Sequence, residues 1–348
     1  MGTSQRSDMS QERGELSPQP RPSWAQITCQ TPSQKELKTG IRAKLGNLLE
    51  LSKPRLTALV VLSTMSSYAL APGELTVWGL LILTCGTALC SASANAINMG
   101  REPDFDRQMT RTSTRPVVTG KVTTTEAFSF AAVCGVTGTA VLAAGINPIV
   151  ASLGAANIAL YGGLYTSLKR VHIANTWVGA VVGAIPPLMG WAACASLADP
   201  GVWLLAGLLY SWQFPHFMSL SYSIAAEYKR AGYVMSAWTN PLLTARVALR
   251  HAVAMFPLCI GLCYVGVCDW GYALDSSIVN GWLVYTSYNF WKQQRNIAKG
   301  LEIITECGQH KYYARQLFWA SVIHLPAVLI LAMVHKKGNL ENIMSAFN

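Results

Sequence analysis

The hydrophobic residues of this chain cluster into nine long runs, and each run is bounded by a short polar segment. Most runs approach the ~20 residues that an α-helix needs to cross a bilayer. The pattern therefore predicts an all-α, polytopic membrane protein with nine transmembrane helices. The predicted spans are roughly Leu56–Ala71, Leu75–Ala96, Glu126–Ala144, Pro148–Tyr165, Thr176–Ala195, Val202–Ile224, Val247–Val267, Ser276–Trp291 and Leu317–Val334.

The polar segments between the runs form two sets that alternate along the chain. One set holds more than half of the chain's 27 Lys and Arg residues, and the other holds none. The basic segments are residues 99–125, 166–175, 225–246 and 292–316. Because basic loops stay on the cytoplasmic or matrix side of a membrane, we expect these four loops and the N-terminus on that side. Eight or ten spans would mix the two sets.

The composition supports this class and suggests the domain boundaries. Charged residues make up 13% of the 348-residue chain, compared with about 25% in soluble proteins. The net charge of +10 does not indicate nucleic-acid binding, because most basic residues lie in short loops. Residues 1–44 are polar, lack the apolar core of a secretory signal and are predicted to be a disordered extension. Residues 45–335 are predicted to form the membrane domain, and residues 336–348 a short tail.

The first basic loop carries the pattern most suggestive of chemistry. Asn98, Glu102 and Asp106 recur every four residues, so a continuing helix would present them on one face as oxygen ligands. Such ligands suit Mg2+, which takes one or two carboxylates together with substrate phosphates and water. Three arginines follow with the same spacing, at Arg107, Arg111 and Arg115. Guanidinium groups bind phosphate oxygens bidentately, so the loop predicts a diphosphate held through Mg2+ at the membrane surface.

Two further regions near the same membrane face are candidates for a site. Tyr165, Lys169, Arg170 and His172 lie in or just after the fourth run. The Lys–Arg pair is either a second phosphate contact or simply a determinant of membrane orientation. Deeper in the membrane, consecutive prolines at 186–187 interrupt the fifth run, and Pro215 interrupts the sixth. Prolines break or kink helices, so these positions predict an internal pocket.

Four motifs resemble one known family. Asn98 to Asp106, followed by Met109, Arg111, Thr112, Arg115 and Pro116, is similar to the first acidic motif of the UbiA-type intramembrane prenyltransferases. The stretches YTSLKR, GAIPPLMGW and WQFPHF leading to EYKRAGY resemble the branch of that family that acts on heme. The resemblance covers roughly residues 52–235. Glu227 stands where that branch usually has Asp, which lengthens the carboxylate's reach at the second acidic motif.

The resemblance implies a UbiA-type helix bundle around a central cavity. It further implies transfer of a farnesyl group from farnesyl diphosphate to a vinyl group of heme B, with addition of water. The product would be heme O, which a downstream heme A synthase converts for cytochrome c oxidase. The implied Mg2+ ligands and catalytic residues are Asn98, Glu102, Asp106 and Glu227. The implied substrate-binding residues are Arg111, Arg115, Lys169, Arg170, Tyr165, Arg230, His216 and His172.

Several alternatives remain open from the sequence. His216 is either an interior hydrogen-bonded residue or an axial ligand of heme iron, and Glu227 alone is also typical of a solvated loop. The whole chain could instead prenylate a quinone precursor, transport a solute through broken helices, or bind heme without catalysis. The resemblance and the polar N-terminal extension favour the mitochondrial inner membrane, with the basic loops in the matrix.

Overall fold

The structure is a computed structural model that describes residues 34–301 and 311–338. The chain divides into two compact units, Met1–Ala43 and Lys44–Asn348, and the helical bundle belongs to the second. Helix α1 (Gln34–Leu51) begins within the segment that was predicted to be disordered, so residues 34–44 are helical. The rest of that predicted extension lies outside the described residues.

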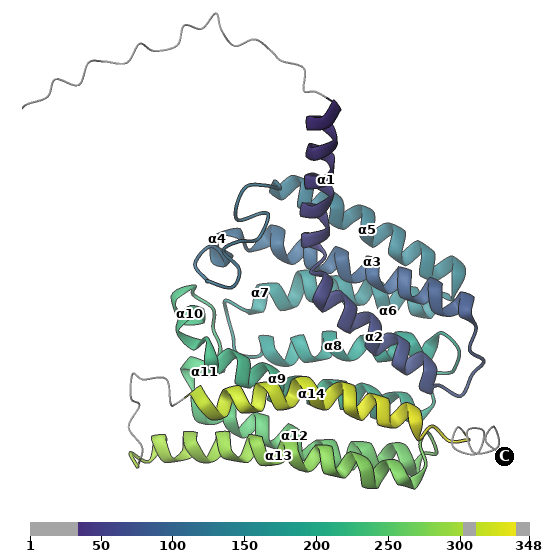
Figure 1. The fold of residues 1–348 in the computed structure, drawn as a ribbon, viewed down its shortest axis with the longest axis vertical. Coiled ribbons are helices and arrows are strands. Elements are labelled where there is room, and N and C mark those ends of the chain that lie inside the picture. Colours follow the sequence, from purple (N-terminus) through teal and green to yellow (C-terminus); the bar gives the residue numbers. More distant parts are fainter. Residues whose placement is uncertain (1–33, 302–310, 339–348) are drawn as a thin grey trace, which may run out of the picture. The chain divides into compact units, whose positions relative to one another are not determined.

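Every predicted run corresponds to a long helical segment in the described part of the second unit, and Figure 1 shows these segments lying side by side. The segments are α2 (Pro54–Leu70), α3 (Val77–Arg101), α5 (Thr124–Gly145), α6 (Pro148–Ile158) continuing through the π-helix η2 (Ala159–Tyr165) and α7 (Thr166–Leu168), α8 (Asn175–Ala192), α9 (Pro200–Ser223), α12 (Pro241–Tyr264), α13 (Trp270–Ala298) and α14 (Tyr312–Val334). Helix α13 extends beyond its predicted apolar run at both ends, because hydropathy marks only the central part of a helix with polar termini.

Five segments within the described ranges are long and apolar enough to cross a membrane by length and composition. These are Val77–Arg101, Thr124–Gly145, Pro148–Leu168, Pro241–Tyr264 and Tyr312–Val334. Helix α2, by contrast, has only 17 residues. The all-α membrane class is therefore supported, whereas the count of nine spans stays a prediction.

Polar residues followed by proline set several helix starts. Asn147, Asp199 and Asn240 each accept a hydrogen bond from a backbone N–H in the first turn of α6, α9 and α12. In all three helices a proline occupies the next position, where its missing N–H has no helical partner to lose. These local signals fix where the long helices begin and hence how they are aligned at their ends.

The prolines were predicted to break or kink the fifth and sixth runs, and no break occurs. Helix α8 continues through Pro186 and Pro187, and α9 continues through Pro215. Proline removes one helical hydrogen bond, but packing by neighbouring helices can outweigh that loss. Helix α8 packs against α2 and α9, and the Ser67 hydroxyl of α2 donates to the Pro187 carbonyl at 2.6 Å.

The loops predicted to share one membrane face meet at one end of the helices. Short helices α4 (Pro103–Asp106), α10 (Ala225–Arg230) and α11 (Ser236–Thr239) lie there together with α7, at the left of Figure 1. They come from three of the four basic loops. This end of the bundle is therefore where charged side chains from distant parts of the sequence can combine.

Candidate functional site

A cavity of about 470 Å³ lies within the bundle, as the sequence predicted. Its wall is polar toward the end that carries the short helices and largely apolar elsewhere. The polar wall is formed by Lys53, Asn98, Glu102, Asp106, Arg111, Arg115, Tyr161, Tyr165 and Lys169. The apolar wall includes Leu56, Leu59, Leu209, Trp212, Phe214, Phe217, Leu220 and Leu325. Such a cavity suits a ligand with a charged head and a long hydrocarbon part.

The three oxygen-bearing residues of the first acidic motif do line the same cavity, but one continuous helix does not present them. Helix α3 ends at Arg101, because Glu102 precedes Pro103 and adopts a non-helical backbone, φ −122° and ψ 25°. Asp106 then lies at the end of the short helix α4. The expectation of a shared helix face was therefore wrong, while the expectation that the residues converge on one cavity was right.

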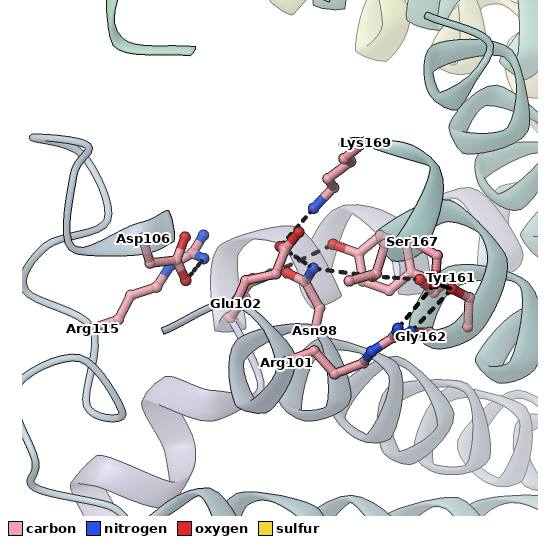
Figure 2. A network of polar contacts seen from close by, with 12 residues as sticks. Asn98, Arg101, Glu102, Asp106, Arg115, Tyr161, Gly162, Ser167 and Lys169 are labelled. Carbon is pink, nitrogen blue, oxygen red and sulfur yellow. Dashed lines mark hydrogen bonds and ion pairs between the residues drawn. The ribbon is translucent and has the colours of Figure 1, made fainter. Parts of the chain in front are cut away.

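Two buried ion pairs hold these acids (Figure 2). The Lys169 ammonium contacts Glu102 Oε2 at 2.8 Å, and the Arg115 guanidinium contacts Asp106 Oδ2 at 2.5 Å. The carboxylate side chains are 1% and 4% exposed. Asn98 Nδ2 also donates to Glu102 Oε2 at 2.7 Å. A buried charge without a partner is costly, so each buried carboxylate depends on the base that is paired with it.

A neighbouring arginine fixes the end of α3 to the π-helix. Arg101 donates to the Gly162 carbonyl at 2.6 Å and to the Ser167 hydroxyl at 2.9 Å (Figure 2). This anchor joins two segments more than sixty positions apart in the sequence. It places Asn98 on α3 beside Thr166, whose hydroxyl accepts a hydrogen bond from Asn98 Nδ2 at 3.2 Å.

Lys53, which sequence reasoning missed, also reaches this cluster. Its ammonium donates to Asn98 Oδ1 at 2.7 Å and lies 3.5 Å from the Tyr161 hydroxyl. Burial, followed by the positive charges of Arg115 and Lys169, lowers the pKa of Lys53 well below its usual range. The sequence feature that could have revealed Lys53 is its position directly before Pro54, the first residue of α2. Its left-handed backbone, φ 48°, aims the side chain inward from the junction of α1 and α2.

The cluster fits a magnesium ion by the chemistry of its donors. Asn98, Glu102 and Asp106 supply hard oxygen ligands, and Glu102 Oε1 is buried without a hydrogen-bond partner in the described structure. Among residues 34–301 and 311–338, no three His, Cys, Asp or Glu side chains gather as a metal cage. Mg2+ needs no such cage, because it keeps waters and takes substrate phosphates as ligands. Burial, and then the Glu102 and Asp106 carboxylates, raises the pKa of nearby Tyr233.

Two charged residues of the second acidic motif, Glu227 and Arg230, lie beside the cavity and do not line it. Glu227 accepts a hydrogen bond from the Thr110 backbone N–H at 2.9 Å, and Arg230 donates to the Gln108 carbonyl at 3.1 Å. Both side chains therefore connect α10 to the loop that follows α4. Tyr228, between them, is buried and does line the cavity. The predicted role of Glu227 as a metal ligand stays a prediction.

Three other predicted side chains also lie outside the cavity wall. The Arg170 guanidinium lies over the Phe105 ring, 4.1 Å from its centroid. His172 is exposed, and its Nδ1 accepts a hydrogen bond from the Ala174 N–H. Arg107 is paired with exposed Asp104. Of the three arginines spaced four apart, only Arg111 and Arg115 reach the cavity.

His216 lies on the cavity wall away from the charged cluster. Its Nδ1 lies 3.0 Å from the Ser321 hydroxyl, and its ring stacks on Trp212 with centroids 4.9 Å apart. Ser321 belongs to α14, and Leu325 of the same helix also lines the cavity. The sequence predicted no site residue in the C-terminal third of the chain. That region supplies Leu325 to the cavity wall and Ser321 as a partner of His216, and neither residue belongs to a recognisable motif.

Comparison with known proteins shows the class of enzyme to which this fold and site belong. A sequence profile of the UbiA prenyltransferase family matches residues 60–300, and the chain therefore belongs to that family. A structure of digeranylgeranylglyceryl phosphate synthase shares the fold with a TM-score of 0.63 at 18% identity, over 84% of this chain and 98% of that one. A UbiA homologue from Archaeoglobus fulgidus bound to GPP and Mg2+ has a TM-score of 0.53 at 13% identity, over 82% and 99%.

Much stronger sequence similarity points to one branch of the family. A mitochondrial protoheme IX farnesyltransferase from Yarrowia lipolytica is 59% identical over 324 residues, which cover 90% of this chain and 69% of the relative. Its counterpart from Saccharomyces cerevisiae is 58% identical over 314 residues, covering 87% and 67%. The chain is thus an enzyme of the UbiA family, similar over most of its length to protoheme IX farnesyltransferases.

Proposed function

We propose that this chain transfers a farnesyl group from farnesyl diphosphate to a vinyl group of heme B and adds water, giving heme O. The observation that carries this proposal is the pair of buried acids, each held by a base, at the polar end of a largely apolar cavity. That layout separates a place for diphosphate from a place for hydrocarbon. The relatives named protoheme IX farnesyltransferase support heme as the acceptor.

The charged cluster performs the first step in this proposal. Lys169 and Arg115 neutralise Glu102 and Asp106 in the described structure, and each base can turn to a phosphate oxygen when the acids take a metal. Mg2+ bound by Asn98, Glu102 and Asp106 would supply positive charge to the diphosphate as its carbon–oxygen bond breaks. The bases then hold a leaving group that gains negative charge, so they stabilise the transition state more than the substrate.

The apolar wall binds the farnesyl chain and the heme in this proposal. Leucines from α2, α9 and α14 surround the cavity and exclude water from an allylic cation. His216 and the aromatic residues beside it offer a flat apolar surface with one imidazole, which suits a porphyrin and its iron. We assign the heme to this side of the cavity.

The relatives' mitochondrial names support a mitochondrial location for this chain. We propose the inner membrane, with the charged end of the cavity facing the matrix, because the basic loops lie at that end. A heme A synthase would then receive the product on the way to cytochrome c oxidase.

A reaction with purified protein tests the assignment. The protein is incubated with farnesyl diphosphate, Mg2+ and either heme B or 4-hydroxybenzoate, and the products are identified by mass spectrometry. We expect heme O from heme B and no prenylated benzoate. Product from the benzoate alone would assign the chain to quinone biosynthesis, and rapid substrate counterflow in proteoliposomes without any covalent product would identify a transporter.

A further inference from the structure

A second, smaller cavity of about 140 Å³ lies directly beside the first. Both cavities share wall residues, among them Val60, Tyr161, Gly183, Pro186 and Gln213. The second cavity extends between α3, α6 and α8, within helices predicted to lie in the membrane. We call it the side chamber.

The side chamber carries polar atoms that lack protein partners. Thr87 Oγ1, Asn95 Oδ1 and Asn157 Oδ1 belong to its wall and are buried without a hydrogen bond in the described structure. Thr87 and Asn95 are each only 2% exposed. Buried polar atoms are costly to leave unpaired, and a polar cavity of this volume is large enough for several water molecules. Hydrocarbon in the same space would leave all three oxygens unsatisfied.

The rest of the chamber's polar wall is already ordered by internal hydrogen bonds. Asn95 Nδ2 donates to the Ser52 carbonyl at 3.1 Å, while the Thr57 and Ser91 hydroxyls lie 2.8 Å apart. The bond from Asn95 Nδ2 holds its side-chain amide, so Asn95 Oδ1 keeps its place in the chamber wall. Asn95 accordingly presents a carbonyl oxygen as an acceptor for water.

Gln213 and Tyr161 stand where the two cavities meet. Gln213 donates to the Ala180 and Leu209 carbonyls, which fixes its amide at the boundary. A β-carbon at Gly183 would collide with the Gln213 amide as it is placed, so glycine leaves room for that amide beside α8. The two cavities thus meet at the polar side chains of Gln213 and Tyr161, together with apolar residues that both walls share.

We propose that the side chamber stores the water that is added in the second half of the reaction. This inference rests on the proposed function. Farnesyl transfer forms a bond between the farnesyl carbon and the outer vinyl carbon, using the vinyl electron pair, and leaves a cation on the carbon next to the porphyrin. A water oxygen donates a lone pair to that carbon, and the water's proton goes to the released diphosphate.

Separate storage reconciles two conflicting needs of the site. The allylic cation of the first step must be kept from water, whereas the second cation must meet one. Water that is held by the chamber's polar wall lies near the reaction cavity without filling it. If water does not arrive, the second cation instead loses a proton and gives an alkene that is lighter by one water.

Two near-isosteric substitutions test this arrangement. Thr87→Val combined with Asn157→Leu removes two of the unpaired oxygens and changes no residue that lines the reaction cavity. We expect diphosphate release to persist while the ratio of hydroxylated to alkene product falls by about tenfold, in line with two lost hydrogen-bond partners. Thr87→Ser, which keeps the hydroxyl, should retain the wild-type ratio.

A second readout does not depend on catalysis. Met189 lines the side chamber, whereas Met255 is equally buried and lies elsewhere in the core. In hydroxyl-radical footprinting, radicals formed from a bound water can oxidise a methionine beside it to the sulfoxide. We expect Met189 to be labelled faster than Met255 in the wild type, and this difference to shrink in the double variant.

The outcomes separate the chamber from the overall function. If wild-type protein makes no farnesylated heme, the proposed function fails, and the footprinting alone still reports on the chamber. If the wild type makes heme O and the folded double variant keeps the wild-type product ratio, the chamber proposal is overturned. Equal labelling of the two methionines in the wild type overturns it as well.

Discussion

Two acidic segments of this chain look alike in sequence and differ in their surroundings. In the first, Glu102 and Asp106 are buried on the cavity wall, and each is paired with a base. In the second, Glu227 accepts a backbone hydrogen bond from the first loop and does not line the cavity. A glutamate therefore forms a buried ion pair on the cavity wall in the first segment, whereas a glutamate in the second segment holds two loops together through a backbone hydrogen bond. Burial and partners, more than the motif, separate the two roles.

The largest effect should come from the buried acid at the end of α4. Asp106→Ala removes a proposed metal ligand and leaves the half-buried Arg115 without its carboxylate partner, so heme O formation should fall by about 1000-fold. Asp104→Ala is the matched control, because Asp104 lies in the same short helix but is exposed and contacts only Arg107 and its neighbours. Initial rates of product formation in detergent measure both variants.

Because the loss of a buried ion pair also destabilises a fold, Asp106→Asn and thermal melting should accompany this measurement. Full activity in a folded Asp106→Ala protein would contradict the mechanism. It would favour a non-catalytic heme-binding role, especially if His216→Ala then abolished function.

The next largest effect is expected from the base that holds Glu102. Lys169→Met should reduce kcat by about 100-fold, since a phosphate contact of the transition state is lost. Arg170→Met, at the neighbouring position outside the cavity wall, should have a much smaller effect. Steady-state kinetics with varied farnesyl diphosphate compare the two. An equal loss of kcat in both variants would show that a position on the cavity wall does not separate bases that contact the substrate from bases that only support the fold.

A more modest change is expected at Arg111, which lines the cavity without a recorded carboxylate partner in the described structure. Arg111→Ala should raise the KM for farnesyl diphosphate by about tenfold through loss of a phosphate contact. Arg107→Ala, four positions earlier and outside the cavity wall, should leave KM unchanged. A KM effect of Arg107→Ala as large as that of Arg111→Ala would support three equivalent arginines, as their equal spacing suggests.

The smallest effect is expected in the second acidic motif. Glu227→Gln keeps an acceptor for the Thr110 N–H, so activity should fall by only about threefold. The apparent affinity for Mg2+, measured by titration of activity, should stay near the wild-type value. A large rise in the Mg2+ requirement would instead show that Glu227 is a metal ligand, as the sequence predicted, and would make the two segments equivalent.

The sequence predicted the helices well because membrane helices are marked by composition over some twenty residues. It could not tell which prolines end a helix, because that outcome depends on tertiary packing. Pro103 does end α3, which moves Glu102 off the helix, whereas Pro186 and Pro187 stay inside α8. The local sequence does not show which helices will pack around Pro186 and Pro187, and that packing allows α8 to continue through them.

Spacing alone predicted the part of the candidate site that is close in sequence, whereas Lys169 and His216 were predicted from the family resemblance, and other distant residues were missed. Asn98, Glu102 and Asp106 share one motif, so spacing revealed them. Lys53 meets Asn98 across 45 positions, and Ser321 meets His216 across 105. No periodicity links such pairs, because which helices become neighbours is decided by packing throughout the bundle.

The central claim is that buried oxygen ligands and bases bind diphosphate through Mg2+ at the polar end of this cavity. Formation of heme O from heme B and farnesyl diphosphate by purified protein, measured with Mg2+, after chelation and after Mg2+ is restored, tests it most directly. We predict product with Mg2+, background levels after chelation and recovery on restoration. Undiminished product in the presence of the chelator would contradict the account.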